Sequence, residues 1–124
     1  MKNIQFVTAV HGNEIMPTLA LASIGESQIV ANPRALARGV RLIESDLNCS
    51  FGKVGDTYEE KRARELDLQF DPKKVVVDFH TFSIESEPFA IVVDPVMIPL
   101  ASSLGLNHVV HMKHNIKGGH ALID

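Results

Sequence analysis

The stretch that decides the fold reads IQFVTAVHGNE and occupies residues 4–14. Its first seven residues are mostly apolar or β-branched, which predicts a short buried strand. The next three make a turn, and Asn13 has the residue type of an N-cap for a helix that continues to Ile24. A buried strand that passes through a turn into a helix is the repeating unit of α/β proteins.

The rest of the chain continues this alternation. Strands are expected at residues 28–31, 74–79, 89–93 and 108–112, and helices at residues 58–68 and 95–104, with an irregular stretch holding at most a short helix at residues 34–51. The unbroken apolar character of residues 74–79 favours a central parallel strand. We therefore predict one α/β domain over residues 1–124, with a mixed, largely parallel sheet and helices on both faces.

The clearest helix start lies at Thr57. Thr57 with Glu60 three residues later is a capping-box pattern, and it predicts a helix in which Ala63 and Leu66 face inward. Residues 59–65 carry charges of both signs, a pattern typical of a solvated helix face.

Composition limits the classes of function. The 124 residues carry 12 basic and 15 acidic side chains, a formal charge of −3, so there is no basic footprint for nucleic acid. No apolar run reaches the roughly 18 residues that span a bilayer, and the first residues lack a signal-peptide pattern. The single Cys49 excludes an internal disulfide and fits a reducing compartment. We expect a cytoplasmic enzyme or binding domain.

Two histidines follow predicted strands. His11 comes directly after the first strand, and His80 ends the stretch VVVDFH at residues 75–80. In α/β sheets the ligand site lies beyond the carboxyl ends of the strands, so both side chains can point into one crevice. Two histidines with one carboxylate, here Glu14, are a common ligand set of catalytic zinc and leave one position open. Asp78 is a candidate acceptor for the second ring N–H of His80.

Each of these signals has an ordinary structural alternative. A His-x-x-Glu spacing also arises from a turn histidine followed by a first-turn glutamate that the helix dipole stabilises. A histidine such as His80, taken alone, is more often a hydrogen-bonded core histidine. The two motifs by themselves therefore indicate a metal site only weakly.

The segment between the motifs adds specificity. It contains NPRA at residues 32–35, then Arg41, then DLNCSF at residues 46–51. The ordered series HGNE, NPRA, DLN and DFHT resembles the succinylglutamate desuccinylase/aspartoacylase family, from His11 through at least His80. The resemblance implies a zinc-carboxypeptidase-like fold and zinc-dependent hydrolysis of an amide bond.

The resemblance also assigns roles to single residues. It implies that His11, Glu14 and His80 bind one zinc ion per chain and that Arg41 and Asn48 bind substrate. Cys49 stands where the family has an arginine. Cysteine offers neither the two-pronged geometry nor the fixed charge of a guanidinium. Cys49 is either a small apolar replacement or a reactive thiol.

The family's general base is a glutamate beyond the Asp-x-His motif, and we find no matching residue. Glu85 and Glu87 are alternatives, although both also fit solvent-facing loop positions. Because family members are longer, we expect this chain to correspond to the N-terminal part of their fold, lacking the C-terminal portion. His108, His111 and His114 form a second group, which we interpret as incidental because three-residue spacing does not align side chains on a strand.

The leading hypothesis is a zinc-dependent hydrolase that cleaves an amide bond, or alternatively an ester bond, of a small acidic N-acyl amino acid. The alternatives are a non-catalytic metal- or ligand-binding domain and a structural fragment that needs its missing half to fold. The sequence leaves open the substrate, the metal preference and whether the protein forms a homo-oligomer.

Overall fold

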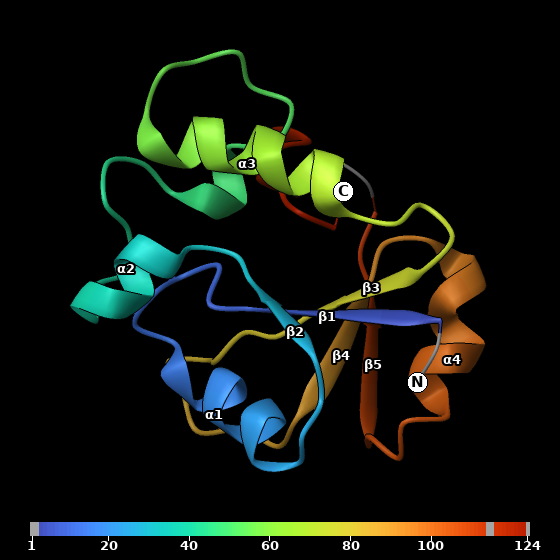
Figure 1. The fold of residues 1–124 in the computed structure, drawn as a ribbon. Helices are drawn as coiled ribbons and strands as arrows, with labels where there is room; N and C mark the ends of the chain where they lie inside the picture. Colours follow the sequence, from blue (N-terminus) through green and yellow to red (C-terminus); the bar gives the residue numbers. More distant parts are fainter. Residues whose placement is uncertain (1–2, 114–115, 124) are drawn as a thin grey trace.

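The chain alternates strands and helices, as the sequence predicts. The computed structural model describes residues 3–113 and 116–123. Its helices and strands are β1 (Ile4–Thr8), α1 (Ile15–Ser23), β2 (Gln28–Val30), α2 (Pro33–Arg38), α3 (Tyr58–Gln69), β3 (Val75–Asp78), β4 (Phe89–Val92), α4 (Ile98–Ser102) and β5 (His108–His111) (Figure 1). Short 3-10 turns lie at η1 (Leu47–Cys49), η2 (Pro95–Met97) and η3 (Ile116–Gly118). Within the described residues, no helix is both long and apolar enough to cross a bilayer.

The strands form two parallel sheets. The first has the order β2-β1-β3, and the second pairs β4 with β5. The α/β class with parallel strands is thus confirmed, although the described strands fall into two sheets instead of one. The prediction that residues 74–79 form the central strand is wrong, since β1 lies between β2 and β3. The residues of β3 are only half-buried, and an apolar run does not determine how many strands lie beside it.

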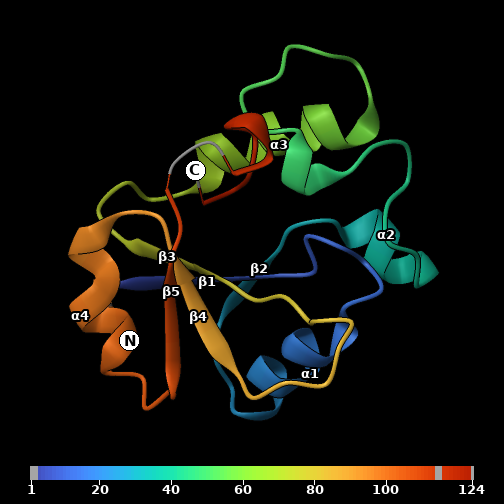
Figure 2. The same cartoon turned by 180° about the vertical axis from the view of Figure 1, so that it is seen from behind.

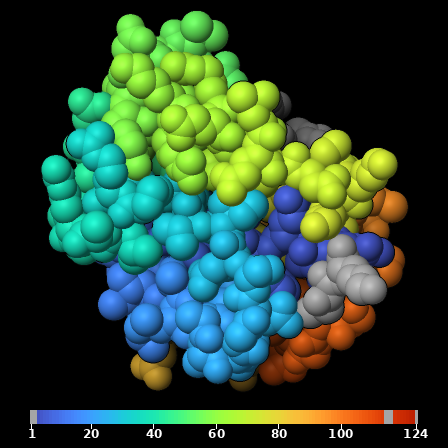
Figure 3. All heavy atoms as spheres, in the orientation of Figure 1, coloured from blue at the N-terminus to red at the C-terminus, as the bar shows by residue number. Residues whose placement is uncertain are grey.

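Helices cover both faces of the three-stranded sheet. The side chain of Val7 in β1 packs in one core cluster with Ala63 and Leu66 of α3. On the other face, the Thr8 hydroxyl donates to Gln28, whose amide donates to the carbonyl of Thr18 in α1. Accordingly, α1 and α3 lie on opposite sides of β1 in both ribbon views (Figures 1 and 2). The last three residues of β1 are buried, and only part of this strand shows at the surface in Figure 3.

Helix α3 begins as predicted. The Thr57 side chain accepts from the backbone of Glu60, and the Glu60 side chain accepts in return from the backbone of Thr57. Ala63 and Leu66 are fully buried. The prediction of a solvated face over residues 59–65 is wrong for Glu59, which is fully buried because its carboxylate accepts hydrogen bonds from a neighbouring loop.

Two other boundaries differ from the predictions. Helix α1 has Glu14, not Asn13, at its N-cap position, and Glu14 makes no capping bond because its carboxylate turns toward two histidines. The helix expected over residues 95–104 is divided into the turn η2 and the five-residue α4. Pro99 lacks the N–H that would continue the hydrogen bonding from η2.

Gly12 allows α2 to approach the turn after β1. A Cβ atom at Gly12 would lie 2.1 Å from the backbone carbonyl carbon of Ala35, at a position already occupied by the first turn of α2. The backbone N–H of Gly12 donates to the carbonyl of Arg41 at 3.1 Å. The turn that carries His11 is therefore fixed between α2 and the loop after it.

We expect Gly12→Ala to lower the free energy of unfolding by about 3 kcal/mol or more, because the new methyl group collides with rigid backbone. The matched control is Gly39→Ala, where φ is 63° and no atom lies within 4 Å of the added Cβ. Gly39→Ala should lower the free energy of unfolding by about 1 kcal/mol, because alanine is strained in a left-handed backbone conformation. Chemical denaturation measures both variants, and equal losses would contradict the steric explanation.

Candidate metal centre

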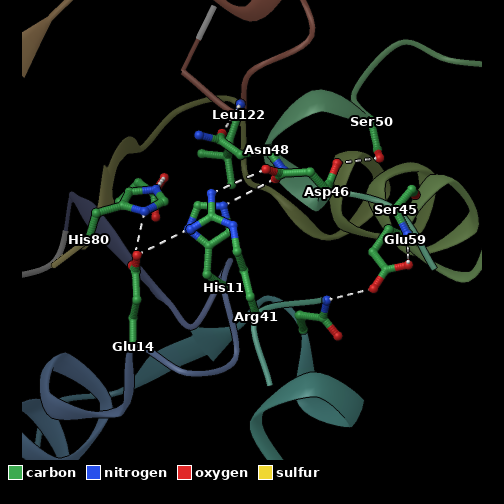
Figure 4. Close-up of polar contacts among 12 residues, drawn as sticks. His11, Glu14, Arg41, Ser45, Asp46, Asn48, Ser50, Glu59, His80 and Leu122 are labelled. Carbon is green, nitrogen blue, oxygen red and sulfur yellow. Dashed lines mark hydrogen bonds and ion pairs between the residues drawn. The ribbon is translucent and has the colours of Figure 1, made fainter. Parts of the chain in front are cut away.

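Three side chains that the sequence analysis selects meet beyond the carboxyl ends of the strands of the first sheet. His11 lies just after β1, Glu14 precedes α1, and His80 lies just after β3. β1 and β3 are parallel neighbours with Val7 opposite Asp78, so their carboxyl ends lie side by side. One donor atom from each of His11, Glu14 and His80 can be chosen so that all three lie within 4.8 Å of one another (Figure 4).

The carboxylate of Glu14 lies between the two imidazoles. Its Oε1 is 3.1 Å from His11 Nδ1, and its Oε2 is 3.1 Å from His80 Nδ1. The backbone N–H of Thr81 also donates to Oε2, at 3.2 Å. The side chains of His11 and Glu14 are buried, whereas that of His80 is 31% exposed. The group is thus anchored on one side and open to solvent at His80.

The second ring nitrogen of each histidine contacts a further carboxylate. His80 Nε2 is 2.8 Å from Asp78 Oδ2, at the position the sequence argument gives to Asp78. His11 Nε2 is 3.1 Å from Asp46 Oδ1. Histidines that bind metals usually donate their other N–H to such an acceptor, which fixes the tautomer and frees the remaining nitrogen. Both Nδ1 atoms therefore face the same space as Glu14.

Sequence reasoning did not assign Asp46 to the site. The argument that selects Asp78 for His80 also predicts an acceptor for His11. However, Asp78 is two residues from His80, while Asp46 is 35 residues from His11. Asp46 belongs to the DLN motif. This motif, and not closeness to His11 in the sequence, is the feature that could have identified Asp46 as a site residue.

Charges within the group shift two pKa values strongly. Burial raises the pKa of Glu14, but contacts with His11, His80 and the Thr81 N–H outweigh it and lower the pKa to about 2. Burial lowers the pKa of His80, but Asp78 and Glu14 outweigh it and raise the pKa to about 10. Without a metal, the site at neutral pH therefore contains a Glu14 carboxylate and a His80 imidazolium. A bound cation would replace the His80 proton.

Asp46 connects the histidine group to Arg41 and Asn48. Its Oδ2 is 3.3 Å from the guanidinium of Arg41, whose side chain is 50% exposed. Its Oδ1 accepts from the backbone N–H of Asn48 at 2.9 Å. The amide oxygen of Asn48 accepts from the backbone N–H of Leu122 at 3.2 Å. Cys49 follows as a half-buried free thiol.

The other candidate residues belong elsewhere. Glu85 and Glu87 are exposed. Glu87 contacts Asn107 and His108 beside the second sheet. His111 Nε2 lies 3.3 Å from the carbonyl oxygen of Val93. His114 lies outside the described residues.

The fold and site define a parallel α/β protein with a His-Glu-His group that could hold a metal ion at the carboxyl ends of two strands. The family model of the succinylglutamate desuccinylase/aspartoacylase catalytic domain matches residues 1–121 of this chain. The chain therefore belongs to the succinylglutamate desuccinylase/aspartoacylase family, as its motifs indicate.

Similar proteins agree with this assignment. A probable aspartoacylase of Prochlorococcus marinus subsp. pastoris is 35% identical over 99 residues, which cover 65% of this chain and 34% of that protein. An N-acyl-aromatic-L-amino acid amidohydrolase (carboxylate-forming) of Xenopus tropicalis is 34% identical over 105 residues, covering 64% of this chain and 34% of that protein. The chain thus aligns with about a third of the length of these relatives.

A solved structure supports the fold. The succinylglutamate desuccinylase of Vibrio parahaemolyticus superimposes with a TM-score of 0.60 at 23% sequence identity. The match covers 74% of this chain and 40% of the Vibrio chain. At this level of identity the likeness establishes the zinc-carboxypeptidase-like fold, of which the matched region is a part.

We expect Glu14→Gln to lower the pKa of His80 in the metal-free protein by at least about 1, because the substitution removes one of two negative charges that stabilise the imidazolium. NMR titration of the imidazole signals in the presence of a chelator measures the change. The matched control is Glu87→Gln, which neutralises the carboxylate beside His108 and should leave His80 titrating near 10. A His80 pKa that is the same in both variants would contradict the charge coupling.

Proposed function

We propose that the chain forms the zinc site and part of the substrate site of a zinc-dependent amidohydrolase. Its substrate would be a small acidic N-acyl amino acid, cleaved at the amide bond, with an ester bond as the alternative. The observation that carries the proposal is the convergence of His11, Glu14 and His80, with a carboxylate at the far nitrogen of each histidine. The family and the activities named for the relatives support the reaction class.

The donor set suits zinc. Two imidazole nitrogens and one carboxylate oxygen are a common protein contribution to catalytic zinc, with the fourth position left for water or substrate. Asp46 and Asp78 favour a proton on each Nε2, which leaves both Nδ1 lone pairs free as ligands. Bound zinc would supply Lewis acidity, which polarises a carbonyl group and makes water a stronger acid.

The chain's own residues would bind and orient the substrate. The half-exposed guanidinium of Arg41 can hold a substrate oxygen while its contact with Asp46 restrains it. The contact with Leu122 fixes the Asn48 amide oxygen, so the amide nitrogen is the group left to donate. We do not assign the general base to Glu85 or Glu87, because both are exposed and Glu87 contacts the second sheet.

Metal content tests the zinc site first. We expect about one zinc per purified chain, and an affinity at least about 100-fold weaker in His80→Ala, which loses one of three protein ligands. The matched control is His108→Ala, a histidine beside a carboxylate on the second sheet, which should keep full zinc binding. Elemental analysis and competition with a chelator provide the measurement. Absence of zinc from the folded wild-type protein, even after zinc is supplied, would refute the proposal.

Hydrolysis tests the reaction class. Because no general base is assigned, the zinc-loaded chain should release amino acid from N-acylated substrates slowly, and Arg41→Ala should reduce this rate by at least about a further tenfold through lost substrate binding. A panel of N-acylated acidic and aromatic amino acids, followed by amine release, identifies the preferred side chain. Full zinc occupancy without turnover of any substrate would instead favour a metal-binding domain. That alternative is motivated by Cys49 and by the unassigned general base.

A further inference from the structure

A buried carboxylate outside the histidine group connects α3 to the site. Glu59, in the first turn of α3, is fully buried. Its Oε1 accepts from the backbone N–H of Ile43 at 2.6 Å and from Asn32 Nδ2 at 3.1 Å. Its Oε2 accepts from the backbone N–H groups of Glu44 and Ser45, each at 3.0 Å. Four neutral N–H donors therefore converge on the two oxygens of one carboxylate.

These donors belong to the loop that carries the site's polar groups. Residues 43–45 lie between Arg41 and Asp46. Asp46 contacts both the His11 imidazole and the Arg41 guanidinium. Glu59 thus holds the backbone one residue before the carboxylate that orients His11. Figure 4 shows this series, from Glu59 through Ser45 and Asp46 to His11.

Further contacts join the same loop to the start of α3. The hydroxyl groups of Ser45 and Thr57 lie 2.8 Å apart. The Glu44 carboxylate accepts a hydrogen bond from the backbone N–H of Tyr58. The loop therefore both donates hydrogen bonds to the start of α3 and accepts one from it. Among the side chains that make these contacts, that of Glu59 is fully buried.

We propose that Glu59 is a positioning residue of the candidate metal centre: by fixing residues 43–45 it places Asp46 against His11 Nε2 and Arg41 beside the site. The inference extends the proposed function, since the placement of His11 matters most when that residue binds a metal. Glu59 itself contacts neither metal ligand nor substrate group and acts through the loop.

The geometry requires a carboxylate and not an amide at this position. A glutamine would replace one acceptor oxygen by an NH2 group that faces two N–H donors. Asn32 cannot compensate by rotating its amide, because its oxygen caps α2 by accepting from the N–H of Ala35. Burial raises the pKa of Glu59, but the hydrogen bonds from Ile43, Ser45, Asn32 and Glu44 outweigh it, so the carboxyl group titrates below its ordinary value.

The test compares Glu59→Gln with Glu60→Gln. Both variants remove one negative charge from the same turn of α3. Glutamine at position 60 can still complete the capping box with Thr57, so that helix start is retained. Where Glu59→Gln does not fold, Glu59→Asp takes its place. It keeps the charge, but its side chain is one methylene shorter and cannot reach all four donors.

The decisive measurement is the chemical shifts of the His11 ring nitrogens, recorded by ¹H–¹⁵N NMR at fixed pH in the metal-free protein. We expect the Glu59 variant to shift the His11 signals more than those of His80, which contacts Asp78 and is linked to His11 through the shared Glu14 carboxylate. Zinc affinity should fall by about tenfold, as is typical when an outer partner of a ligand is disturbed. Glu60→Gln should leave the His11 signals and the affinity unchanged.

A structural role alone would lower the melting temperature of the Glu59 variant while its folded form kept wild-type His11 signals. That outcome would overturn the proposal. In the wild-type protein, the amide hydrogens of Ile43, Glu44 and Ser45 should be protected from exchange, and exchange at unprotected rates would also overturn it. If the wild type binds no zinc, the proposed function fails, but the metal-free His11 signals still decide the role of Glu59.

Discussion

The parallel register of β1 against β3 is the constraint on which the site depends. Val7 lies opposite Asp78, and the N–H of Phe79 donates to the carbonyl of Val7 at 3.0 Å. This pairing brings two strand ends together although 69 positions separate His11 from His80 in the sequence. A slip of one residue would turn Asp78 and His80 together toward the opposite face of the sheet, away from His11 and Glu14. The register is therefore as important to the site as the identity of its side chains.

The charges around the histidines explain why a cation suits this site. Glu14, Asp46 and Asp78 surround two imidazoles, and one oxygen of Asp78 is buried without a hydrogen-bond partner among the described residues. Buried carboxylates need compensating charge or hydrogen bonds. In the metal-free protein the His80 proton and Arg41 provide part of it. A divalent ion would supply more positive charge than the proton it displaces.

Features that depend on neighbouring residues could be predicted from the sequence, whereas features that depend on residues far apart in the chain mostly could not. The capping box at Thr57 and the alternation of strands and helices concern neighbouring residues, and the structure has both. The central strand was assigned wrongly because apolar character does not encode pairing partners. Asp46 and Glu59 could not be recognised as site-supporting residues, since Asp46 lies 35 positions from His11 and Glu59 lies 14 to 27 positions from its hydrogen-bond partners. Glu59 also lies in a charged run that resembles a solvated surface.

Cys49 stands where the family resemblance implies an arginine, and under the proposed function this difference would change which charges the chain offers to a substrate. Cys49 follows Asn48 in the η1 turn and brings no fixed positive charge. Arg41 is the cation in contact with Asp46, and one of its nitrogens is already engaged there. A substrate carboxylate that a second guanidinium would otherwise hold must rely on the remaining N–H groups of Arg41 and on neutral donors such as the Asn48 amide. Because neutral donors bind carboxylates more weakly than a guanidinium fork, selection for acidic substrates would rest mainly on Arg41 under the proposed function.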